Sequence, residues 1–306
     1  MVSVTVESLV KTYEDIEALR GLSFSAEEAS MYGIIGPDGA GKTTFMRIAA
    51  CLLFQTSGTV TIGGFDTLTS PARVKRIIGY MPQRFSLYLD LSVRENLLFF
   101  ANLFSVSGDE RRKRIDRLLD FSRLGPFIGR RAGQLSGGMK QKLALSCTLI
   151  HDPEVLFLDE PTTGVDPVSR REFWEILAQL KAAGTTIIVS TPYMDEAERC
   201  DRVGLIFNGA LIEEGAPHEF PDRFRKELLA LRGAGVVKRT RKLRFPDIVS
   251  DVRTFGDRLH LTVSDADAAQ PVIRSFLDAN TLNDVTVERT RPSIEDVFVE
   301  NMAHAM

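Results

Sequence analysis

The fold of this chain is decided by the stretch Gly36-Pro37-Asp38-Gly39-Ala40-Gly41-Lys42-Thr43-Thr44, which matches GxxxxGK[ST] at every fixed position. The apolar residues 31–35 before it predict a buried strand, and residues 43–53 after it predict a helix. A glycine-rich loop between a strand and a helix gathers backbone N–H groups at the helix N-terminus, where they attract an anion. Lys42 adds a full positive charge, and the hydroxyl of Thr43 suits Mg²⁺. The stretch therefore predicts a site for the phosphates of ATP or GTP.

Composition is that of an ordinary globular protein. The 306 residues are 44% hydrophobic and 26% charged, with a formal net charge of -3, and this length predicts about two domains. Cys51, Cys147 and Cys200 show no CxxC spacing, which favours reduced, buried thiols in the cytosol over disulfides or a zinc site. No apolar run approaches the roughly 18 residues of a membrane-spanning helix, and the N-terminus lacks the apolar core of a signal peptide. Any membrane role therefore requires a partner, and the even charge gives no sign of nucleic-acid binding.

Polar side chains follow two apolar runs that predict buried strands. Gln83 comes shortly after residues 77–81, and Asp159 and Glu160 come directly after residues 155–158. Ligands of open α/β sheets gather at the carboxyl ends of the strands. Gln83 is therefore predicted to reach the metal or the attacking water, Asp159 to hold Mg²⁺ and Glu160 to polarise the water. The alternatives are a solvated loop glutamine and a surface acidic pair, and the apolar run up to Asp159 argues against the second.

An antiparallel region precedes the phosphate loop. Residues 2–28 alternate apolar and polar side chains, which predicts two antiparallel strands joined through residues 11–15. Tyr13 is the aromatic residue of that connection and can stack on a purine base, or else pack on its own sheet. Much later in the chain, residues 201–215 predict two edge strands around an Asn208-Gly209 hairpin turn.

Several helices are predicted between the strands. Residues 92–95 form a capping box that starts a helix reaching about residue 104. The loop before it carries Phe85 and other apolar side chains, which either tuck in or form a docking surface. Residues 109–131 combine many arginines with apolar residues at helical spacing, which is typical of an amphipathic helix with a solvated face. A further helix is predicted over residues 167–182.

Residues 135–141 read Leu-Ser-Gly-Gly-Met-Lys-Gln and precede a helical stretch to about Ile150. Two glycines and a serine at a helix start form a second anion site, or a simple N-cap. With this stretch in place, residues 1–222 resemble the nucleotide-binding domain of an ABC transporter in unbroken motif order. Many P-loop NTPases share the phosphate loop and the Val-Leu-Phe-Leu-Asp-Glu strand, whereas LSGGxxQ between them is the mark of the ABC family.

The resemblance implies an α/β P-loop NTPase core with an antiparallel β subdomain and a helical subdomain. It also implies that two such domains dimerise head to tail around two ATP molecules and Mg²⁺, and that residues 85–103 form the surface that receives the coupling helix of a membrane subunit. It further implies the following residue roles: Tyr13 stacks on adenine; Gly36, Pro37, Asp38, Gly39, Ala40, Gly41, Lys42, Thr43 and Thr44 bind the nucleotide; Thr43, Gln83 and Asp159 serve the metal; Glu160, Lys42 and Gln83 serve catalysis; Leu135, Ser136, Gly137, Gly138 and Gln141 form the signature that reaches the partner's nucleotide; and Asp166 communicates across the dimer.

The chain departs from this family at Pro192. After the strand ending at Ser190 and Thr191 the family usually places a histidine that contacts the γ-phosphate, and proline offers neither a side-chain donor nor an N–H. Loss of one such donor lowers a rate by on the order of 10²–10³. The site is therefore expected to hydrolyse slowly. Either a heterodimer supplies an intact histidine, or a homodimer depends on Glu160 alone, with Tyr193 as a substitute.

Residues 223–306 predict a different order of strands and helices. Strands are predicted at residues 227–232, 249–255, 258–263 and 284–288, with a helical or irregular stretch after the first, a helix over residues 266–279 and a last helix from Ser293. The order βαββαβ is the ferredoxin-like pattern of a small α+β domain. It resembles the C-terminal extension of ATP-binding subunits in the drug-, lantibiotic- and polysaccharide-exporting branch. A dimer-stabilising or folding appendage is favoured over a regulatory ligand site, and the basic residues 238–244 are interpreted as a solvated linker rather than a nucleic-acid contact.

The sequence thus predicts the ATP-hydrolysing subunit of an ABC exporter, peripheral on the cytoplasmic face of the membrane beside a separately encoded permease. The alternative is a soluble ABC ATPase acting on DNA or ribosomes, but neither a second such domain nor a long coiled-coil insertion occurs in this sequence. Pro192 keeps a third class open, an inactive ATP-gated scaffold. A GTPase is disfavoured because no NKxD motif is present.

Overall fold

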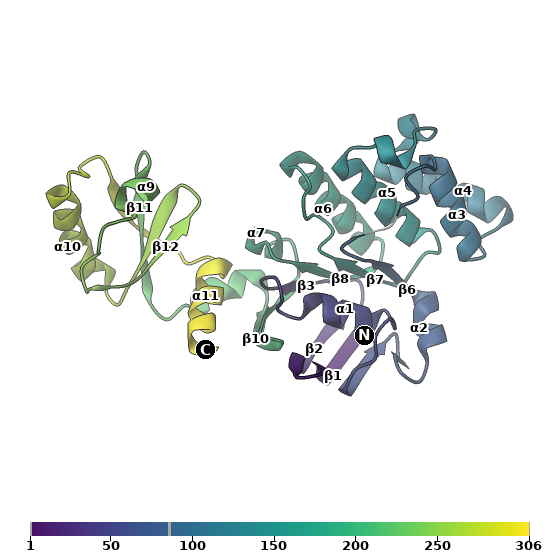
Figure 1. Cartoon of the computed structure of the whole chain (residues 1–306), viewed down its shortest axis with the longest axis horizontal. Helices are drawn as coiled ribbons and strands as arrows, with labels where there is room; N and C mark the ends of the chain where they lie inside the picture. The colour runs from purple at the N-terminus through teal and green to yellow at the C-terminus, as the bar shows by residue number, and fades with distance from the viewer. Residues whose placement is uncertain (1, 85–86, 306) are drawn as a thin grey trace. The chain divides into compact units, whose positions relative to one another are not determined.

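The computed structural model describes residues 2–84 and 87–305 and divides the chain into two compact units, Met1–Pro217 and His218–Met306. Phe85, singled out in the sequence, lies outside the described residues. The larger unit is built on a six-stranded sheet with the order β10–β9–β3–β8–β7–β6 (Figure 1). Its strands are β3 (Met31–Ile35), β6 (Ile78–Met81), β7 (Val155–Asp159), β8 (Thr186–Thr191), β9 (Arg202–Phe207) and β10 (Ala210–Gly215). Every neighbouring pair is parallel except β9 with β10.

A second, antiparallel sheet packs against one side of this core. Its order is β2–β1–β4–β5, formed by β1 (Val2–Tyr13), β2 (Ile16–Glu27), β4 (Ser57–Ile62) and β5 (Phe65–Asp66). Helix α1 (Lys42–Ala49) lies between the two sheets, where Phe45 meets Phe24 of β2 and Phe157 of β7 with ring centroids 5.2 and 6.4 Å apart. Because both faces of β3, β7 and β8 are covered, these strands are buried along their whole length, as their continuous apolar runs require.

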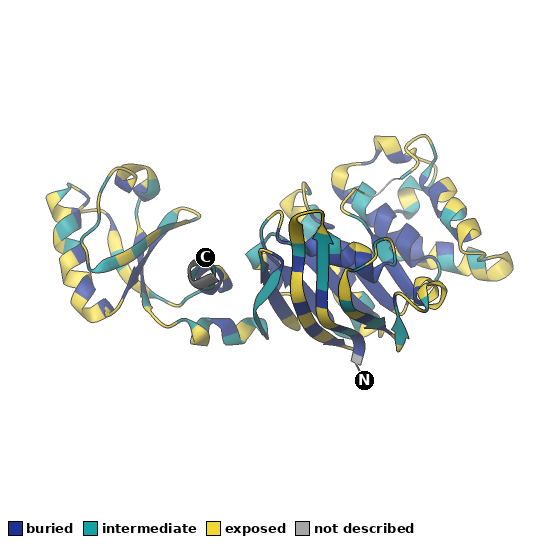
Figure 2. Cartoon of the chain, turned by 60° about the horizontal axis from the view of Figure 1, so that its bottom comes forward, coloured by how far each residue is buried: buried dark blue, intermediate teal, exposed yellow. Residues whose placement is uncertain are grey.

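A helical subdomain covers the other side of the six-stranded sheet (Figure 1). It consists of α3 (Val93–Leu103), α4 (Gly108–Ser122), α5 (Gly137–Leu149) and α6 (Pro167–Ala182), and the unit also contains α2 (Pro71–Ile77), α7 (Met194–Ala197) and 3₁₀ turns at Gly125–Phe127 and Ala132–Gln134. Helix α5 is buried over most of its length, because it packs against α3, α4, α6 and β6 (Figure 2). The predicted capping box starts α3, since the hydroxyl of Ser92 accepts from the N–H of Glu95 and the Glu95 carboxylate accepts from the N–H of Ser92.

Two expectations about this unit were wrong. The helix after the phosphate loop ends at Ala49, not at residue 53, because Cys51 takes the left-handed conformation with φ 54°. The segment 201–215 does form a hairpin through Asn208 and Gly209, but only β10 lies at the sheet edge. Strand β9 pairs in parallel with β3 on its other side, which explains why Val203–Ile206 are buried.

The smaller unit has a four-stranded antiparallel sheet with the order β12–β13–β11–β14. Its elements are the 3₁₀ turn Pro217–Glu219 at the boundary, α8 (Phe220–Arg223), β11 (Glu227–Arg232), α9 (Val236–Thr240), β12 (Val249–Phe255), β13 (Arg258–Val263), α10 (Ala266–Ala279), β14 (Thr286–Thr290) and α11 (Ile294–Ala305). The predicted βαββαβ order is thus present, with the last strand two residues later than expected, and the interleaved strand order is that of a ferredoxin-like domain.

Helices lie on both faces of this small sheet. Helices α9 and α10 cover one face, where Leu229, Leu261 and Ile273 belong to one buried apolar cluster. Helix α11 is attached to the other face through His260 of β13, whose Nδ1 lies 3.1 Å from Oδ1 of Asp296, with both side chains buried. Among the described residues of the whole chain, no helix is both long and apolar enough to cross a bilayer.

Candidate nucleotide-binding site

The phosphate loop is shaped by two glycines that no other residue can replace without moving the backbone. Gly41 caps α1 with φ 103°, and a Cβ there would lie 2.6 Å from the carbonyl oxygen of Ala18. A Cβ on Gly36 would lie 2.2 Å from the carbonyl oxygen of Ile206. Both clashes are with backbone, so the loop can pass close to β2 and β9 only because these side chains are absent. The free N-terminus of α1 is thereby presented at the carboxyl end of β3.

Lys42 is buried at the centre of this loop. Its Nζ donates to the carbonyl oxygens of Gly36 and Pro37 at 2.8 and 3.0 Å, and it forms an ion pair with Oε1 of Glu160 at 3.0 Å. Both charged side chains are at most 6% exposed, so each compensates the other's loss of solvent. The predicted catalytic lysine and glutamate are therefore in direct contact.

Asp159 lies at the end of β7 and is fully buried. Its Oδ1 accepts hydrogen bonds from the hydroxyls of Thr43 at 3.1 Å and Ser190 at 2.8 Å. Its Oδ2 is buried and has no hydrogen-bond partner among the described residues. Burial raises the pKa of Asp159, and the hydrogen bonds from Ser190 and Thr43 oppose that shift. An unpartnered carboxylate oxygen beside a threonine hydroxyl is a donor set that suits a hard cation such as Mg²⁺.

Glu160 is held from several sides above the loop. The amide nitrogen of Gln83 donates to its Oε2 at 2.8 Å, and the hydroxyl of Thr163 does so at 3.4 Å. Its backbone has φ 49°, which is unfavourable for a residue with a Cβ and is held by hydrogen bonds from its N–H to the carbonyl oxygen and hydroxyl of Ser190. The three candidates Lys42, Gln83 and Glu160 therefore converge on one point.

The hollow at this point is lined by Ala18, by Gln83, by Glu160 and by residues 38–44 of the loop. Tyr13 does not line it. The tyrosine ends β1 with 40% of its surface exposed, and Nζ of Lys11 lies 4.9 Å from the centre of its ring. Among residues 2–84 and 87–305 no hydrogen bond orients that ring toward the loop, so adenine stacking by Tyr13 stays a prediction.

The signature residues 135–141 do not line this hollow. Ser136 is exposed and caps α5, with its hydroxyl accepting from the N–H of Met139 at 3.3 Å. Gly137 is exposed too, whereas Gly138 is buried so closely against α6 that a Cβ would lie 2.3 Å from that of Ser169. Leu135 is buried, and Gln141 lines a separate hollow together with Gly137 and Gln83. The N-cap alternative is confirmed, and the second anion site stays a prediction.

Asp166 caps α6, and its Oδ1 accepts from the N–H groups of Val168 and Ser169 at 3.1 and 3.0 Å. The hydrogen bond from Ser169 is the main reason why the pKa of Asp166 is lowered. The side chain is exposed on the segment that follows Glu160. A helix cap of this kind fixes where α6 begins, and so fixes the loop before it.

The segment after Pro192 is fastened to α6 by residues that the sequence analysis missed. Arg170 forms an ion pair with Oε1 of the buried Glu196 at 2.7 Å and contacts both carboxylate oxygens of Asp195 at 2.9 and 2.8 Å. Thr162 donates to the same Oε1 of Glu196 at 2.7 Å. Arg170 also lies over the ring of Tyr193, 4.4 Å from its centre. Tyr193 is thus turned onto α6 and is not among the residues that line the phosphate hollow.

Only weak indications in the sequence suggest that these residues contact one another. Arg170 stands four positions after Asp166, one helical turn into α6, and Asp195 and Glu196 form an acidic pair near Pro192. Ser190 is the penultimate residue of the apolar strand β8, and parallel pairing sets it beside Asp159 at the end of β7. Only the sheet order makes these neighbours visible.

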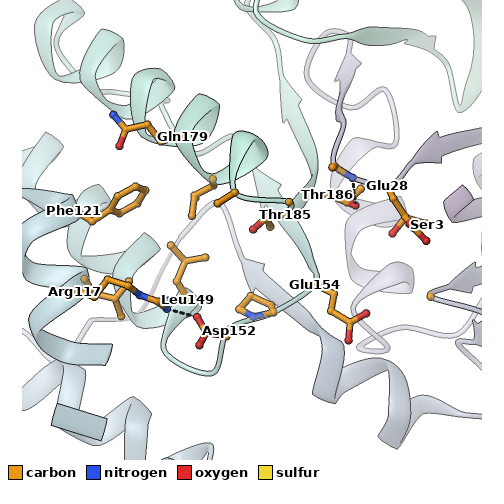
Figure 3. A pocket seen from close by; sticks show the side chains of 17 residues that line it. Ser3, Glu28, Arg117, Phe121, Leu149, Asp152, Glu154, Gln179, Thr185 and Thr186 are labelled. Carbon is orange, nitrogen blue, oxygen red and sulfur yellow. Dashed lines mark hydrogen bonds and ion pairs between the residues drawn. The ribbon is translucent and has the colours of Figure 1, made fainter. Parts of the chain in front are cut away.

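The larger hollow of this unit lies elsewhere and has a different character (Figure 3). Its lining includes Glu154 and Thr185, which directly precede β7 and β8, so it lies at the amino ends of these strands, whereas the phosphate loop follows the carboxyl end of β3. Phe121 and Leu149 form apolar walls, and Arg117 is paired with Asp152 (Figure 3). None of the residues that line the phosphate hollow also lines this larger hollow.

Fold and site together define a P-loop nucleotide-binding protein with an added helical subdomain. The family model for ABC transporters matches residues 19–163. The probable multidrug ABC transporter ATP-binding protein YbhF of Escherichia coli strain K12 is 41% identical over 307 residues, covering 99% of this chain and 52% of that protein. The Nod factor export ATP-binding protein I of Rhizobium sp. strain N33 is 34% identical over 300 residues, covering 97% and 96%.

Solved structures agree with these relatives. The cbiO1 protein from Clostridium perfringens, part of an ABC transporter complex, is 29% identical with a TM-score of 0.67, covering 71% of this chain and 90% of that one. A dimeric ATP-binding cassette in a post-hydrolysis state bound to ADP and Pi is 29% identical with a TM-score of 0.63, covering 70% and 98%. This chain belongs to the ATP-binding proteins of ABC transporters. It spans about half the length of the multidrug-transporter relatives that it matches.

Proposed function

We propose that this chain binds ATP with Mg²⁺ and hydrolyses it, and that it powers export through a separately encoded membrane subunit. The observation that carries the proposal is the convergence of Lys42, Gln83 and Glu160 above the phosphate loop, with Thr43 and Asp159 beside them. A structural role alone does not explain why two acids and a lysine are buried together at a helix N-terminus, because burying charges costs free energy that apolar residues avoid.

The geometry suggests how nucleotide binding prepares the site. Lys42 is now paired with Glu160, and the triphosphate would compete for the lysine as a more highly charged partner. Glu160 would then lose its cationic neighbour while Gln83 still holds its Oε2, which leaves Oε1 free to accept a proton from water. Thr43 and Asp159 would hold Mg²⁺, which supplies positive charge against the phosphate oxygens.

We propose that Ser136, Gly137 and Gly138 act on the nucleotide of a facing ATPase domain. Ser136 and Gly137 are exposed and do not line the phosphate hollow of their own chain, which supports an action in trans. The N-terminus of α5 behind them favours an anion. A solved relative is a dimer bound to ADP and Pi, so the same assembly is proposed here, either of two identical chains or with a second ATPase. Asp166 would sit near that interface.

Pro192 weakens the proposed site without removing it. The histidine position carries no donor, and Tyr193, the expected substitute, is engaged with Arg170. Catalysis by this copy would therefore depend on Glu160, and a partner with an intact histidine would carry the faster site.

A membrane partner is proposed for the apolar surface of α3 and the loop before it. Tyr88, Leu89, Phe99, Leu103 and Phe104 are between 38% and 64% exposed, and Tyr88 packs on Phe99 with ring centroids 4.5 Å apart. Exposed apolar side chains that cluster in this way are typical of a docking surface. The coupling helix of a permease is the proposed occupant, which places the chain on the cytoplasmic face of the membrane. The relatives named for multidrug and Nod factor export support the direction.

The test is ATPase activity together with capture of the partner. The purified chain is expected to hydrolyse ATP with Mg²⁺, and Glu160→Gln is expected to abolish turnover while keeping ATP binding. A tagged chain isolated from detergent extracts is expected to bring down a multi-spanning membrane protein. Recovery of ribosomes or DNA instead would overturn the transport assignment. Failure of the correctly folded wild-type chain to bind ATP would overturn the assignment of the nucleotide-binding site.

A further inference from the structure

The smaller unit contains a groove that ATP hydrolysis does not use. The residues that line it belong to α9, to the loops on either side of α9 and to the β12–β13 hairpin. Figure 1 shows where α9 and β12 lie in this unit. Helix α9 has only five residues, so it covers the centre of the sheet and leaves β12 partly open. Val252 of β12 is consequently 39% exposed, although Leu259 on the neighbouring strand is buried. An apolar sheet surface is left without a complete cover.

Basic side chains lie along this groove without acidic partners. Lys238 and Arg241 line it and are exposed, and within residues 2–84 and 87–305 neither forms an ion pair. Arg239, between them, behaves differently, because it pairs with both carboxylate oxygens of Asp284 outside the groove. Asp257 is the acid that lines the groove, but its side chain is 97% exposed and faces Arg258 at 3.8 Å. The groove therefore presents uncompensated positive charge next to apolar surface.

The open side of the groove is a strand edge. Strand β12 is outermost in the order β12–β13–β11–β14, and seven residues without proline form it. Alternate residues of an outer antiparallel strand turn their N–H and C=O groups away from the sheet, where another extended segment can pair with them. Val252 and Thr254 point to the α9 side, so a segment added here would send every second side chain toward Lys238 and Arg241.

Other occupants fit these features less well. Nucleic acid is recognised by stacking on free aromatic rings, whereas Phe245, the aromatic residue of the groove, packs against Phe276 with ring centroids 5.2 Å apart. A membrane surface requires apolar side chains that protrude, whereas Val237, Leu243 and Leu259 line a concavity. A small anion would leave the apolar floor and the strand edge unused.

We propose that the groove between α9 and β12 binds an extended acidic peptide segment as an additional strand. One face of the peptide would alternate acidic residues, which meet Lys238 and Arg241, with apolar residues, which cover the exposed Val252. The main chain would pair with β12 and supply affinity without sequence preference. This role goes beyond ATP hydrolysis and does not depend on it, because it gives the accessory domain a partner of its own.

The first test uses the full chain and a fluorescent peptide in which Asp and Val alternate on one face and Thr fills the other. Lys238→Glu with Arg241→Glu is expected to weaken binding by about tenfold or more. Lys242→Glu with Arg244→Glu is the matched control, because it reverses two charges of the same basic run that do not line the groove. The control is expected to change affinity by less than about threefold. Equal losses in both variants would overturn the proposal.

A second pair of variants tests the apolar floor. Val252→Asp is expected to repel the same peptide, whereas Val272→Asp on α10 is expected to leave binding unchanged, since Val272 is 42% exposed and does not line the groove. Hydrogen exchange of the full chain is expected to show new protection of β12 when the peptide is added. Absence of saturable binding, equal affinity for a peptide with Lys in place of Asp, binding without protection of β12, or competition by phosphatidylglycerol vesicles or DNA would each overturn the proposal.

Discussion

Charge is held in opposite ways in the two units of this chain. In the larger unit, Lys42, Asp159 and Glu160 are at most 5% exposed; Lys42 pairs with Glu160, and Asp159 accepts a hydrogen bond from Thr43. In the smaller unit, Lys238 and Arg241 stand exposed beside an apolar groove. Buried charges tolerate few replacements, because each depends on a partner at a fixed distance. Exposed charges tolerate many replacements, so their sequence pattern predicts little about function until the fold shows which surface they lie beside.

The largest effect on activity is expected from replacing the buried Glu160. Glu160→Gln keeps the size of the side chain and removes the proton acceptor, so the rate of ATP hydrolysis is expected to fall by about 10²–10⁴. ATP binding, measured by equilibrium dialysis, is expected to persist. Glu154→Gln is a control, since that carboxylate lies at the opposite edge of the sheet and is expected to leave the rate unchanged. A variant at position 160 that hydrolyses ATP at the normal rate would contradict the assigned role.

The next effect is a gain. Pro192→His supplies the donor that the phosphate site lacks, and the ATPase rate is expected to rise, at most by the factor on the order of 10²–10³ that such a donor contributes. Steady-state phosphate release by the purified chain measures it. Pro192→Ala is the control, because it restores the N–H without a ring donor. Equal rates in the wild type and both variants would show that Pro192 does not limit hydrolysis.

A third prediction concerns the residues that hold the Pro192 segment. Arg170→Ala leaves Glu196 charged, 1% exposed and without its cation, so the larger unit is expected to lose about 3 kcal/mol of unfolding free energy. Urea unfolding can be followed through Trp174, the single tryptophan, which is buried one turn further along α6. Adding Glu196→Gln is expected to recover part of the loss.

The surface pair of the smaller unit provides the contrast for this prediction. Arg239→Ala breaks an exposed pair with Asp284, and exposed pairs are screened by solvent, so its effect on stability is expected to be far smaller than that of Arg170→Ala. Comparable losses at both positions would mean that burial does not decide the value of a charge in this chain.

A small gain in stability is expected when Asp159 is replaced, although this residue is part of the proposed metal site. Burial raises the pKa of Asp159, so its ionised form is less favourable in the folded state than in the unfolded one. The destabilisation is absent below the unfolded-state pKa of about 3.9, grows as pH rises from there to the raised folded-state pKa, and is complete above it. Asp159→Asn is therefore expected to stabilise the nucleotide-free protein by about 1 kcal/mol at pH 7, with no gain in strong acid. Thermal unfolding at both pH values checks this, and an equal gain at both would be the contrary result.

Sequence could predict the parts of this molecule in which chemistry fixes both residue type and spacing. Gly36 and Gly41 are required by backbone clashes, so the loop could be predicted. The strand that ends at Met81, shortly before Gln83, and the strand that ends at Asp159 followed from their apolar runs. The βαββαβ order of the smaller unit could be predicted because the spacing of apolar residues differs between strands and helices.

Contacts between distant segments could not be predicted in this way. Arg170 and Glu196 are 26 positions apart and meet only because α6 and the turn after β8 lie together. Strand β9 was misplaced at an edge because its parallel pairing with β3 is not encoded in its own residues. The groove beside β12 depends on how short α9 is, and the sequence suggested only a helical or irregular stretch there.

The central claim is that nucleotide is held between the phosphate loop of one molecule and the signature residues of another. A crystal structure of the Glu160→Gln protein with ATP and Mg²⁺ tests it most directly. The account predicts two nucleotides per dimer, each touching residues 36–44 of one copy and Ser136 of the other. A structure in which ATP occupies the loop while residues 136–138 contact no nucleotide would contradict it.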